Sequence, residues 1–255
     1  MKIIVCIKQV PDTDDIKWTE NNTMQREGVE SIINPCDLYA MEEALKIKKS
    51  LDNVELIALT MGPLQAQDVL KRAISLGFDR GILLTDKKFA GADTYATGKT
   101  IAAAIKSKLG DFDLILCGQY AIDGDTAQTG PSIASQLGIA QITFVKNLEK
   151  VNEGALQAIR ITDDGIETVK SSYPLLACIL KGAQDTSRPL IDGIKRARQT
   201  EIEVLTMADI DLDEAGIKAS PTYVSKAFRP EHNRGECVFC EVDEFAQKIR
   251  ECANG

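Results

Sequence analysis

The feature that most constrains this sequence is an alternation of short apolar runs with longer segments of helical period. The apolar runs have the length and composition of buried strands and lie at 2–7, 53–60, 81–84, 113–117 and 141–145. Between them, apolar side chains recur at the 3.6-residue spacing of a helix over 37–50, 66–76, 93–109 and 127–137. Strands and helices that alternate with short connections predict an α/β domain with an open, mainly parallel, doubly wound sheet.

The pattern changes after residue 146. Two alternating runs, 155–161 and 166–171, flank Asp163-Asp164-Gly165, which predicts an antiparallel hairpin added to the sheet, and 175–180 is a further strand. Beyond 204 no strand–helix unit follows, although 241–251 has the pattern of a final helix. We therefore expect an α/β domain over 1–204 and a C-terminal arm over 205–255 that packs on a partner subunit.

Charge and composition exclude several classes of protein. A net charge of -8 and a pI near 4.9 argue against a nucleic-acid binder, which needs a basic face. The apolar run at the N-terminus is too short for a signal peptide, and no segment approaches the roughly 20 apolar residues of a membrane helix. We expect a cytoplasmic protein without membrane insertion, whose seven cysteines are reduced.

The cysteines and the single histidine limit the chemistry. His232 alone cannot supply zinc sites with two or three histidines, so a bound cofactor is the better candidate for any reaction. Cys237 and Cys240 form one Cys-x-x-Cys pair, with His232 and Cys252 nearby. One pair is a weak zinc signal, and we predict free thiols and no metal there.

A polar loop with glycines joins the strand at 113–117 to the next helix. In an open parallel sheet, ligands bind at this carboxyl edge, and the free N–H groups of a first helical turn favour phosphate. The other interpretation is a helix start capped by Asp123, Asp125 or Thr126. Neither G-x-G-x-x-G nor a Walker A loop is present, so no standard fingerprint decides between them.

The segment 181–197 is polar but carries Leu190, Ile191 and Ile194. Exposed aliphatic side chains on a loop often mark a docking surface. The alternative is that these side chains fold back onto the sheet, and the pattern leaves both possibilities open.

Several motifs in order along the chain resemble the small (beta) subunit of electron-transfer flavoproteins. They are Asn34-Pro35-Cys36-Asp37, Met61-Gly62-Pro63, the run Ala121-Ile122-Asp123-Gly124-Asp125-Thr126-Ala127-Gln128-Thr129-Gly130, and Ile191-Asp192-Gly193-Ile194-Lys195-Arg196-Ala197. The run Gly216-Ile217-Lys218-Ala219-Ser220-Pro221-Thr222 is similar to the subgroup that serves electron bifurcation.

The resemblance implies a heterodimer with an alpha subunit that holds one FAD. In the bifurcating subgroup a second FAD lies in the small subunit and accepts hydride from NADH. One electron goes to ferredoxin or flavodoxin, and the other passes through the alpha-subunit FAD to a flavin-dependent dehydrogenase, often of the acyl-CoA type. The chain would then be an oxidoreductase subunit that acts through bound FAD. In the conventional group the pocket holds AMP, and a non-redox adenine-nucleotide-binding protein is a further alternative.

The resemblance also implies site residues. The cofactor contacts would be Cys6, Asn34, Pro35, Cys36, Asp37, Met61, Gln119, Ala121, Ile122, Asp123, Gly124, Asp125, Thr126, Ala127, Gln128, Thr129 and Gly130, and the residues that dock on the dehydrogenase would be Leu190, Ile191, Ile194 and Lys195. We expect a helix start at Thr126–Gln128 to bind phosphate, and Asn34 and Gln119 to bind base or sugar edges. No residue is assigned a catalytic role.

Overall fold

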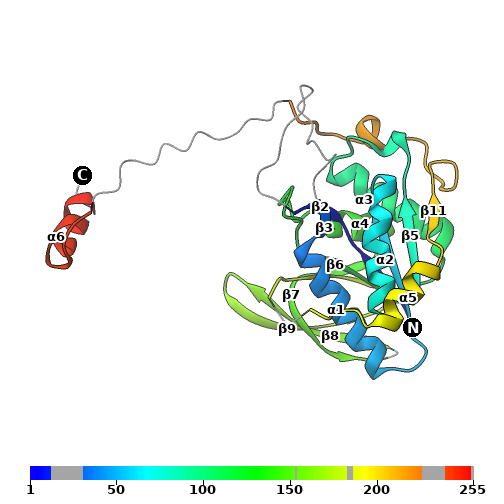
Figure 1. The fold of residues 1–255 in the computed structure, drawn as a ribbon, viewed down its shortest axis with the longest axis horizontal. Coiled ribbons are helices and arrows are strands. Elements are labelled where there is room, and N and C mark those ends of the chain that lie inside the picture. Colours follow the sequence, from blue (N-terminus) through cyan, green and yellow to red (C-terminus); the bar gives the residue numbers. More distant parts are fainter. Residues whose placement is uncertain (13–30, 153, 183–185, 226–238, 254–255) are drawn as a thin grey trace. The chain divides into compact units, whose positions relative to one another are not determined.

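The computed structural model describes residues 1–12, 31–152, 154–182, 186–225 and 239–253. Tertiary contacts divide the chain into two units, Met1–Val224 and Ser225–Gly255. The second unit contains helix α6 (Val242–Ala253), where the sequence predicts a final helix. Figure 1 shows the first unit as a sheet with helices on both sides and a hairpin at one end.

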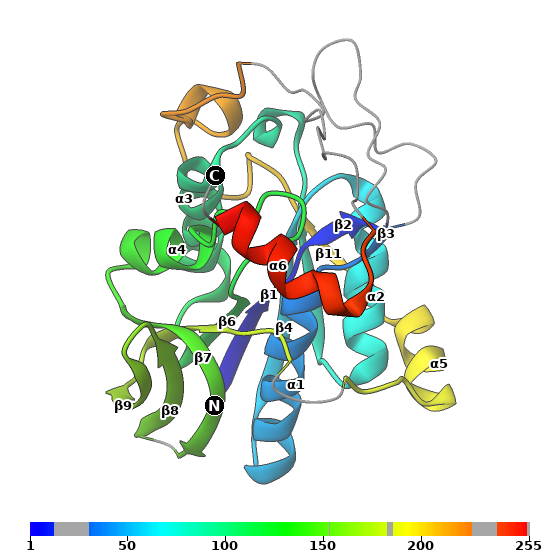
Figure 2. The ribbon, with the colours of Figure 1, turned by 90° about the vertical axis from the view of Figure 1, so that its left-hand side faces the viewer.

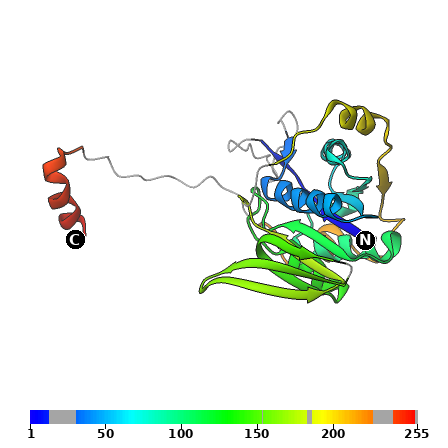
Figure 3. The same cartoon turned by 90° about the horizontal axis from the view of Figure 1, so that it is seen from below.

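A nine-stranded sheet forms the centre of the first unit, in the order β11-β5-β4-β1-β6-β10-β7-β8-β9. Its strands are β1 (Lys2–Cys6), β4 (Glu55–Met61), β5 (Arg80–Leu84), β6 (Leu114–Gly118), β7 (Ala140–Val151), β8 (Ala155–Thr162), β9 (Gly165–Ser172), β10 (Leu175–Ile179) and β11 (Glu203–Leu205). All neighbours from β11 to β7 are parallel, whereas β7–β8 and β8–β9 are antiparallel. The predicted mainly parallel sheet with an antiparallel hairpin is confirmed, and Figure 3 shows the hairpin strands from below.

Helices cover both faces of the sheet (Figures 1 and 2). Those packed on one face are α1 (Pro35–Ser50) and α2 (Gln67–Leu76), with α5 (Ile191–Gln199) against α2. The other face carries α3 (Thr94–Ala104), the π-helical turn η3 (Ile105–Leu109) and α4 (Thr129–Leu137). Three short 3-10 turns complete the unit, η1 (Leu64–Ala66), η2 (Lys87–Phe89) and η4 (Gly216–Ala219).

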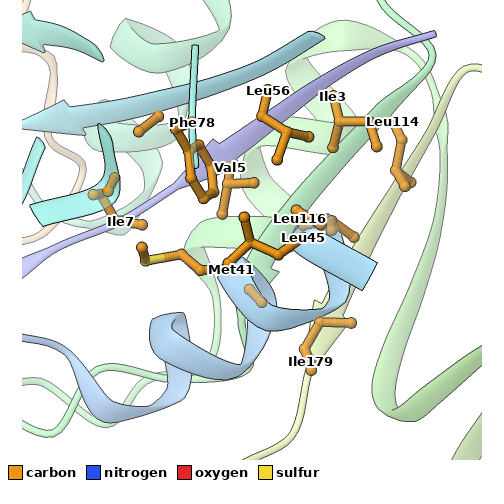
Figure 4. Packing of buried hydrophobic residues seen from close by; sticks show 14 of the residues in the cluster. Ile3, Val5, Ile7, Met41, Leu45, Leu56, Phe78, Leu114, Leu116 and Ile179 are labelled. Carbon is orange, nitrogen blue, oxygen red and sulfur yellow. The ribbon is translucent and has the colours of Figure 1, made fainter. Parts of the chain in front are cut away.

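The core follows from the period-2 alternation of the strands. Ile3 and Val5 of β1 point to the face that also receives Met41 and Leu45 of α1 (Figure 4), whereas Ile4 belongs to the core on the opposite face. Each fully buried aliphatic side chain of this kind stabilises the fold by about 1.5–3 kcal/mol. Because both faces are buried, the strands are apolar throughout, which is why the sequence predicts them well.

Several predicted elements differ from the structure. The helix after β6 begins at Thr129 rather than at Thr126–Gln128, because Asp125 (φ 48°) and Ala127 (φ 54°) have left-handed backbone conformations that a helix cannot contain. The segment 181–197, read as a loop, contains the start of α5. The helix packs on α2, and the side chain of Ala197 is buried in the core on that side of the sheet.

A small antiparallel pair lies outside the main sheet and consists of β2 (Gln9–Pro11) and β3 (Ser31–Ile33). Residues 13–30 lie outside the described part. Residues 205–224, predicted to be part of the arm, belong to the first unit. Asp93 Oδ2 accepts hydrogen bonds there from Thr222 N (3.1 Å) and Thr222 Oγ1 (2.8 Å). That the arm packs on a partner subunit stays a prediction.

No helix in the described part of the chain combines the length and the apolar character needed to cross a membrane.

Candidate functional site

The register of the parallel strands gathers the predicted binding segments at one edge of the sheet. Cys6 at the end of β1 lies opposite Cys117 of β6, and Cys117 lies opposite Cys178 of β10. Met61 ends β4, the other neighbour of β1. The loop 119–128, together with Gly118 of β6 and the first residues of α4, forms a segment that we call the loop 118–130. It therefore starts at the carboxyl edge, where ligands bind in sheets of this kind.

Two buried polar side chains at the start of α1, Asn34 and Asp37, connect the loops at this edge, and we call them the brace. Asn34 Nδ2 donates to Tyr120 O (2.9 Å), and Asn34 Oδ1 accepts from Ile122 N (3.1 Å). Asp37 Oδ2 accepts from Lys8 N (2.8 Å), and Asp37 Oδ1 accepts from Gly118 N (3.1 Å). The brace thus holds the chain after β1 and the chain after β6 in one arrangement.

Gly118 leaves room for the brace. A Cβ atom at this position would overlap Asp37 Oδ1 and the backbone of Cys36 and Asp37. A glycine is needed because of this close approach, and a side chain would force the brace away from β6.

Burial raises the pKa of Asp37 to about 7, although hydrogen bonds from Asn34, from the Lys8 N–H and from the Gly118 N–H oppose the rise. The Asp37 residue is only 6% exposed, so water stabilises the charge of its carboxylate poorly. Asp37 is therefore a group whose charge changes within the physiological pH range.

The alternative interpretation, a helix start capped by Asp123, Asp125 or Thr126, is wrong. Helix α4 has Gln128 at its N-cap position and no side-chain hydrogen bond there. Asp123 Oδ1 instead pairs with Lys8 Nζ at 2.6 Å, and its side chain is nearly buried. Lys8 thus neutralises the carboxylate that would otherwise repel an anion at this loop.

The backbone of the loop presents a row of unused donors. Its first part is a turn, in which the N–H groups of Gly124 and Asp125 donate to Ala121 O. Within the described part of the chain, the N–H groups of residues 126–130 donate to no acceptor. Two left-handed residues, Asp125 and Ala127, followed by the right-handed Gln128 and a helix N-terminus, give a run of backbone N–H groups of the kind that binds phosphate.

Apolar and thiol groups lie behind this array. Gly130 packs directly on Cys178, and Cys117 lies close by. The contact with Cys6 and burial raise the pKa of Cys117, and burial raises the pKa of Cys178 to about 12. These thiols therefore stay protonated, and the side chains behind the loop at Gly130 are uncharged. Among the described residues no cluster of His, Cys, Asp or Glu could hold a metal ion.

The structure brings together Cys6, the segment 34–37, Met61 and the segment 119–130 at the edge. However, the amide oxygens of Asn34 and Gln119, predicted to face base or sugar, accept hydrogen bonds from the chain's own backbone. Asn34 Oδ1 binds Ile122 N, and Gln119 Oε1 binds Phe144 N at 2.6 Å. That the predicted residues contact a nucleotide stays a prediction.

Three residues near the site were not predicted from the sequence. Lys8 pairs with Asp123, Thr94 Oγ1 donates to Gln128 Oε1 (3.1 Å), and Phe144 binds Gln119. Lys8 was open to prediction, because a polar side chain two residues past a parallel strand lies at the ligand edge. Thr94 and Phe144 reach the site only through tertiary packing.

The predicted docking residues are exposed. Leu190 is 79% and Ile191 73% exposed, and Ile194 is partly exposed, so these side chains do not fold back onto the sheet. Arg196 Nη2 donates to Ile74 O (2.5 Å) and holds α5 on α2, and Lys195 forms an ion pair with Asp192 (3.7 Å). Docking by this surface stays a prediction.

His232 and Cys237 of the C-terminal segment lie outside the described residues. Cys240 is described as a free thiol. The prediction of free thiols without metal in this segment therefore remains open.

Comparisons with known proteins fit this architecture. A family model of the electron transfer flavoprotein domain matches residues 21–210. The beta subunit of the electron transfer flavoprotein from Megasphaera elsdenii is 40% identical over 257 residues, covering 98% of this chain and 95% of the relative. The caffeyl-CoA reductase-Etf complex subunit CarD from Acetobacterium woodii is 42% identical, covering 90% and 88%. The protein FixA from Azorhizobium caulinodans is 37% identical, covering 96% and 90%. The family domain covers most of the chain, and the relatives align with nearly all of it. The chain therefore belongs to the electron transfer flavoprotein family and is similar to its beta subunits.

Proposed function

We propose that this chain is the small subunit of a heterodimeric electron-transfer flavoprotein and that it binds FAD at the loop 118–130. In this proposal the heterodimer takes electrons from NADH and divides them between ferredoxin or flavodoxin and, through the FAD of the alpha subunit, a flavin-dependent dehydrogenase. The observation that carries the proposal is the row of unpartnered N–H groups over residues 126–130 at the carboxyl edge of a parallel sheet.

The residues at the edge fit a dinucleotide. The N–H groups of 126–130 would hold the diphosphate, because they point partial positive charge at an anion and have no competing acceptor. Lys8 removes the charge of Asp123 from the same loop, and the brace keeps the loop in place before a ligand binds. Bound flavin would supply hydride acceptance and the release of single electrons, which no side chain can perform.

The proposed partners rest on the relatives and on α5. CarD is named as a subunit of a caffeyl-CoA reductase-Etf complex, which supports an acyl-CoA-type dehydrogenase as the partner of this chain. Exposed aliphatic residues beside a lysine suit a protein interface, and we assign the docking to Leu190, Ile191, Ile194 and Lys195. The proposed location is the cytoplasm, where NADH is available and the described cysteines remain free thiols.

Anaerobic titration with NADH tests the proposal. The full-length chain is co-expressed with its alpha subunit, and the heterodimer is titrated without any dehydrogenase present. The proposal predicts that NADH bleaches the visible absorption band of oxidised flavin. A heterodimer whose flavin NADH does not reduce, and whose small subunit carries AMP, would be a conventional carrier, and the bifurcating assignment would be wrong.

A further inference from the structure

An exposed aromatic residue in an unusual conformation stands near the proposed nucleotide site. Phe144 of β7 has a φ of 57°, and 44% of the residue is exposed. Left-handed backbone is disfavoured for residues with a bulky side chain, and an exposed ring gains little from burial. Neither the backbone nor the packing of Phe144 is explained by the stability of the sheet.

A β-bulge produces this conformation. Ala177 of β10 lies opposite Ile142 of β7, and Ile179 lies opposite Val145. Three steps along β7 therefore match two steps along β10, and the extra residue falls at Thr143–Phe144. Bulges redirect a side chain and are frequent beside functional sites.

A buried side chain fixes the bulge. Gln119 is only 3% exposed, and its Oε1 accepts the N–H of Phe144 at 2.6 Å. Gln119 N also donates to Ile179 O at 2.8 Å. The first residue after β6 thus binds both the strand next to it and the bulge of the strand beyond, and it sets the position of Phe144 relative to the loop 118–130.

The bulge also lies at the carboxyl edge. Ile179 is the register partner of Gly118 on one side and of Val145 on the other. Gly118 precedes the loop that carries the free N–H groups of residues 126–130, and Phe144 immediately precedes Val145. An anion-binding loop and an exposed aromatic ring therefore share one edge, separated by a single strand.

We propose that Phe144 is a stacking residue for a planar heteroaromatic ring of the nucleotide bound at the loop 118–130, an inference that rests on the proposed function. Aromatic side chains bind such rings face to face or edge to face, and this contact needs an exposed ring held rigidly. The bulge exposes the residue, and the hydrogen bond from Phe144 N to Gln119 Oε1 fixes the backbone that carries the ring. The ring is either the adenine or the isoalloxazine, and binding measurements distinguish them.

The test compares Phe144→Leu with Phe144→Tyr and with the control Ile166→Ala, which removes an exposed aliphatic side chain from the outer strand β9. Leucine suits the left-handed backbone no better than phenylalanine, so the strain is matched. Nucleotide-stripped heterodimers are titrated with FAD and with ADP, and their unfolding midpoints are compared to show that they fold alike.

We expect Phe144→Leu to weaken FAD binding about tenfold and the other two variants to bind within about twofold of wild type. If the stacked ring is isoalloxazine, ADP binding is unchanged and the visible flavin band shifts; if it is adenine, ADP binding weakens equally. A Phe144→Leu variant that binds both ligands as wild type does, while wild type binds them, overturns the stacking assignment alone. Wild-type protein that binds neither ligand overturns the proposed function and this assignment with it.

Discussion

Lys8 and Asp123 form an ion pair of 2.6 Å across the candidate nucleotide site, and the pair is asymmetric. The Lys8 side chain is 43% exposed, whereas that of Asp123 is 6% exposed. The carboxylate is thus held in a poorly hydrated place and depends on the lysine for its compensation. The pair joins the chain after β1 to the loop after β6, the loop whose N–H groups at 126–130 we propose hold the diphosphate.

Substitutions of the two partners should change nucleotide affinity in opposite directions. Lys8→Met leaves the Asp123 charge uncompensated beside the phosphates, so FAD and ADP should bind about tenfold more weakly. Asp123→Asn frees the lysine, so binding should be equal or tighter. Titration calorimetry on the stripped heterodimer measures both.

The matched control for that pair is Lys46→Met, which breaks the ion pair with Glu43 on α1 (3.1 Å). It should leave affinity unchanged. Equal weakening by Lys8→Met and Asp123→Asn would contradict the electrostatic explanation and indicate only a disrupted loop.

Asp37 should make stability depend on pH. The pKa of Asp37 in the folded state, about 7, lies above the ordinary value of 3.8, so the folded state holds a proton that the unfolded state releases between these values. The stabilising contribution is complete below about pH 4 and is lost as pH rises to about 7, at up to about 1.4 kcal/mol per unit. Unfolding free energies of wild type and Asp37→Asn are measured from pH 4 to 8.

As pH rises, the unfolding free energy of wild type should fall relative to that of Asp37→Asn. The difference between the two should level off above pH 7. Asp113→Asn serves as control, because Asp113 also accepts a backbone hydrogen bond, from Lys2 N at 2.7 Å. A difference between wild type and Asp37→Asn that stays constant over the whole range would show that Asp37 does not titrate there.

Gly118→Ala should destabilise the first unit by about 1–3 kcal/mol, because the new methyl group overlaps the Asp37 carboxylate and the start of α1. Gly124→Ala is the matched control in the same loop, where a Cβ atom meets nothing within 4 Å. Denaturant unfolding of both variants measures the cost. If the two variants are equally stable, the brace does not approach β6 as closely as described.

Ile191→Ala should slow electron delivery to the dehydrogenase without releasing nucleotide. A docking side chain that is 73% exposed is lost, while the loop 118–130 is untouched. Truncation of an interface residue of this kind costs about 1 kcal/mol or more, so we expect the KM for the flavoprotein to rise about fivefold or more. Ile166→Ala is the control, and a KM that Ile191→Ala leaves unchanged would remove α5 from the interface.

The sequence was sufficient for the features that depend on local pattern. Buried strands such as β1 and β6 are apolar throughout, and Pro35 and Gly77 mark helix ends by their backbone chemistry. The late start of α4 was not predictable, since it depends on two non-glycine residues, Asp125 and Ala127, in left-handed conformations. The bulge at Phe144 was hidden because it arises from the register of β10 against β7 and from Gln119 at a distant position in the chain.

The family motifs indicated which segments meet at the carboxyl edge but not how each residue is used there. Asn34 and Asp37 have the polar groups expected of ligand contacts, yet most of their hydrogen-bonding capacity serves Tyr120, Ile122 and the chain after β1. Only tertiary structure shows whether a buried polar side chain binds a ligand or its own backbone.

The central claim, that this subunit binds FAD at the loop 118–130, is tested most directly by counting the nucleotides released on denaturation of the intact heterodimer. Chromatography with mass spectrometry identifies and quantifies each nucleotide. We predict two FAD and no AMP per heterodimer. On dilution, a Lys8→Met heterodimer should lose the FAD of the small subunit before that of the alpha subunit. One FAD with one AMP, or a small subunit without any nucleotide, would contradict the claim.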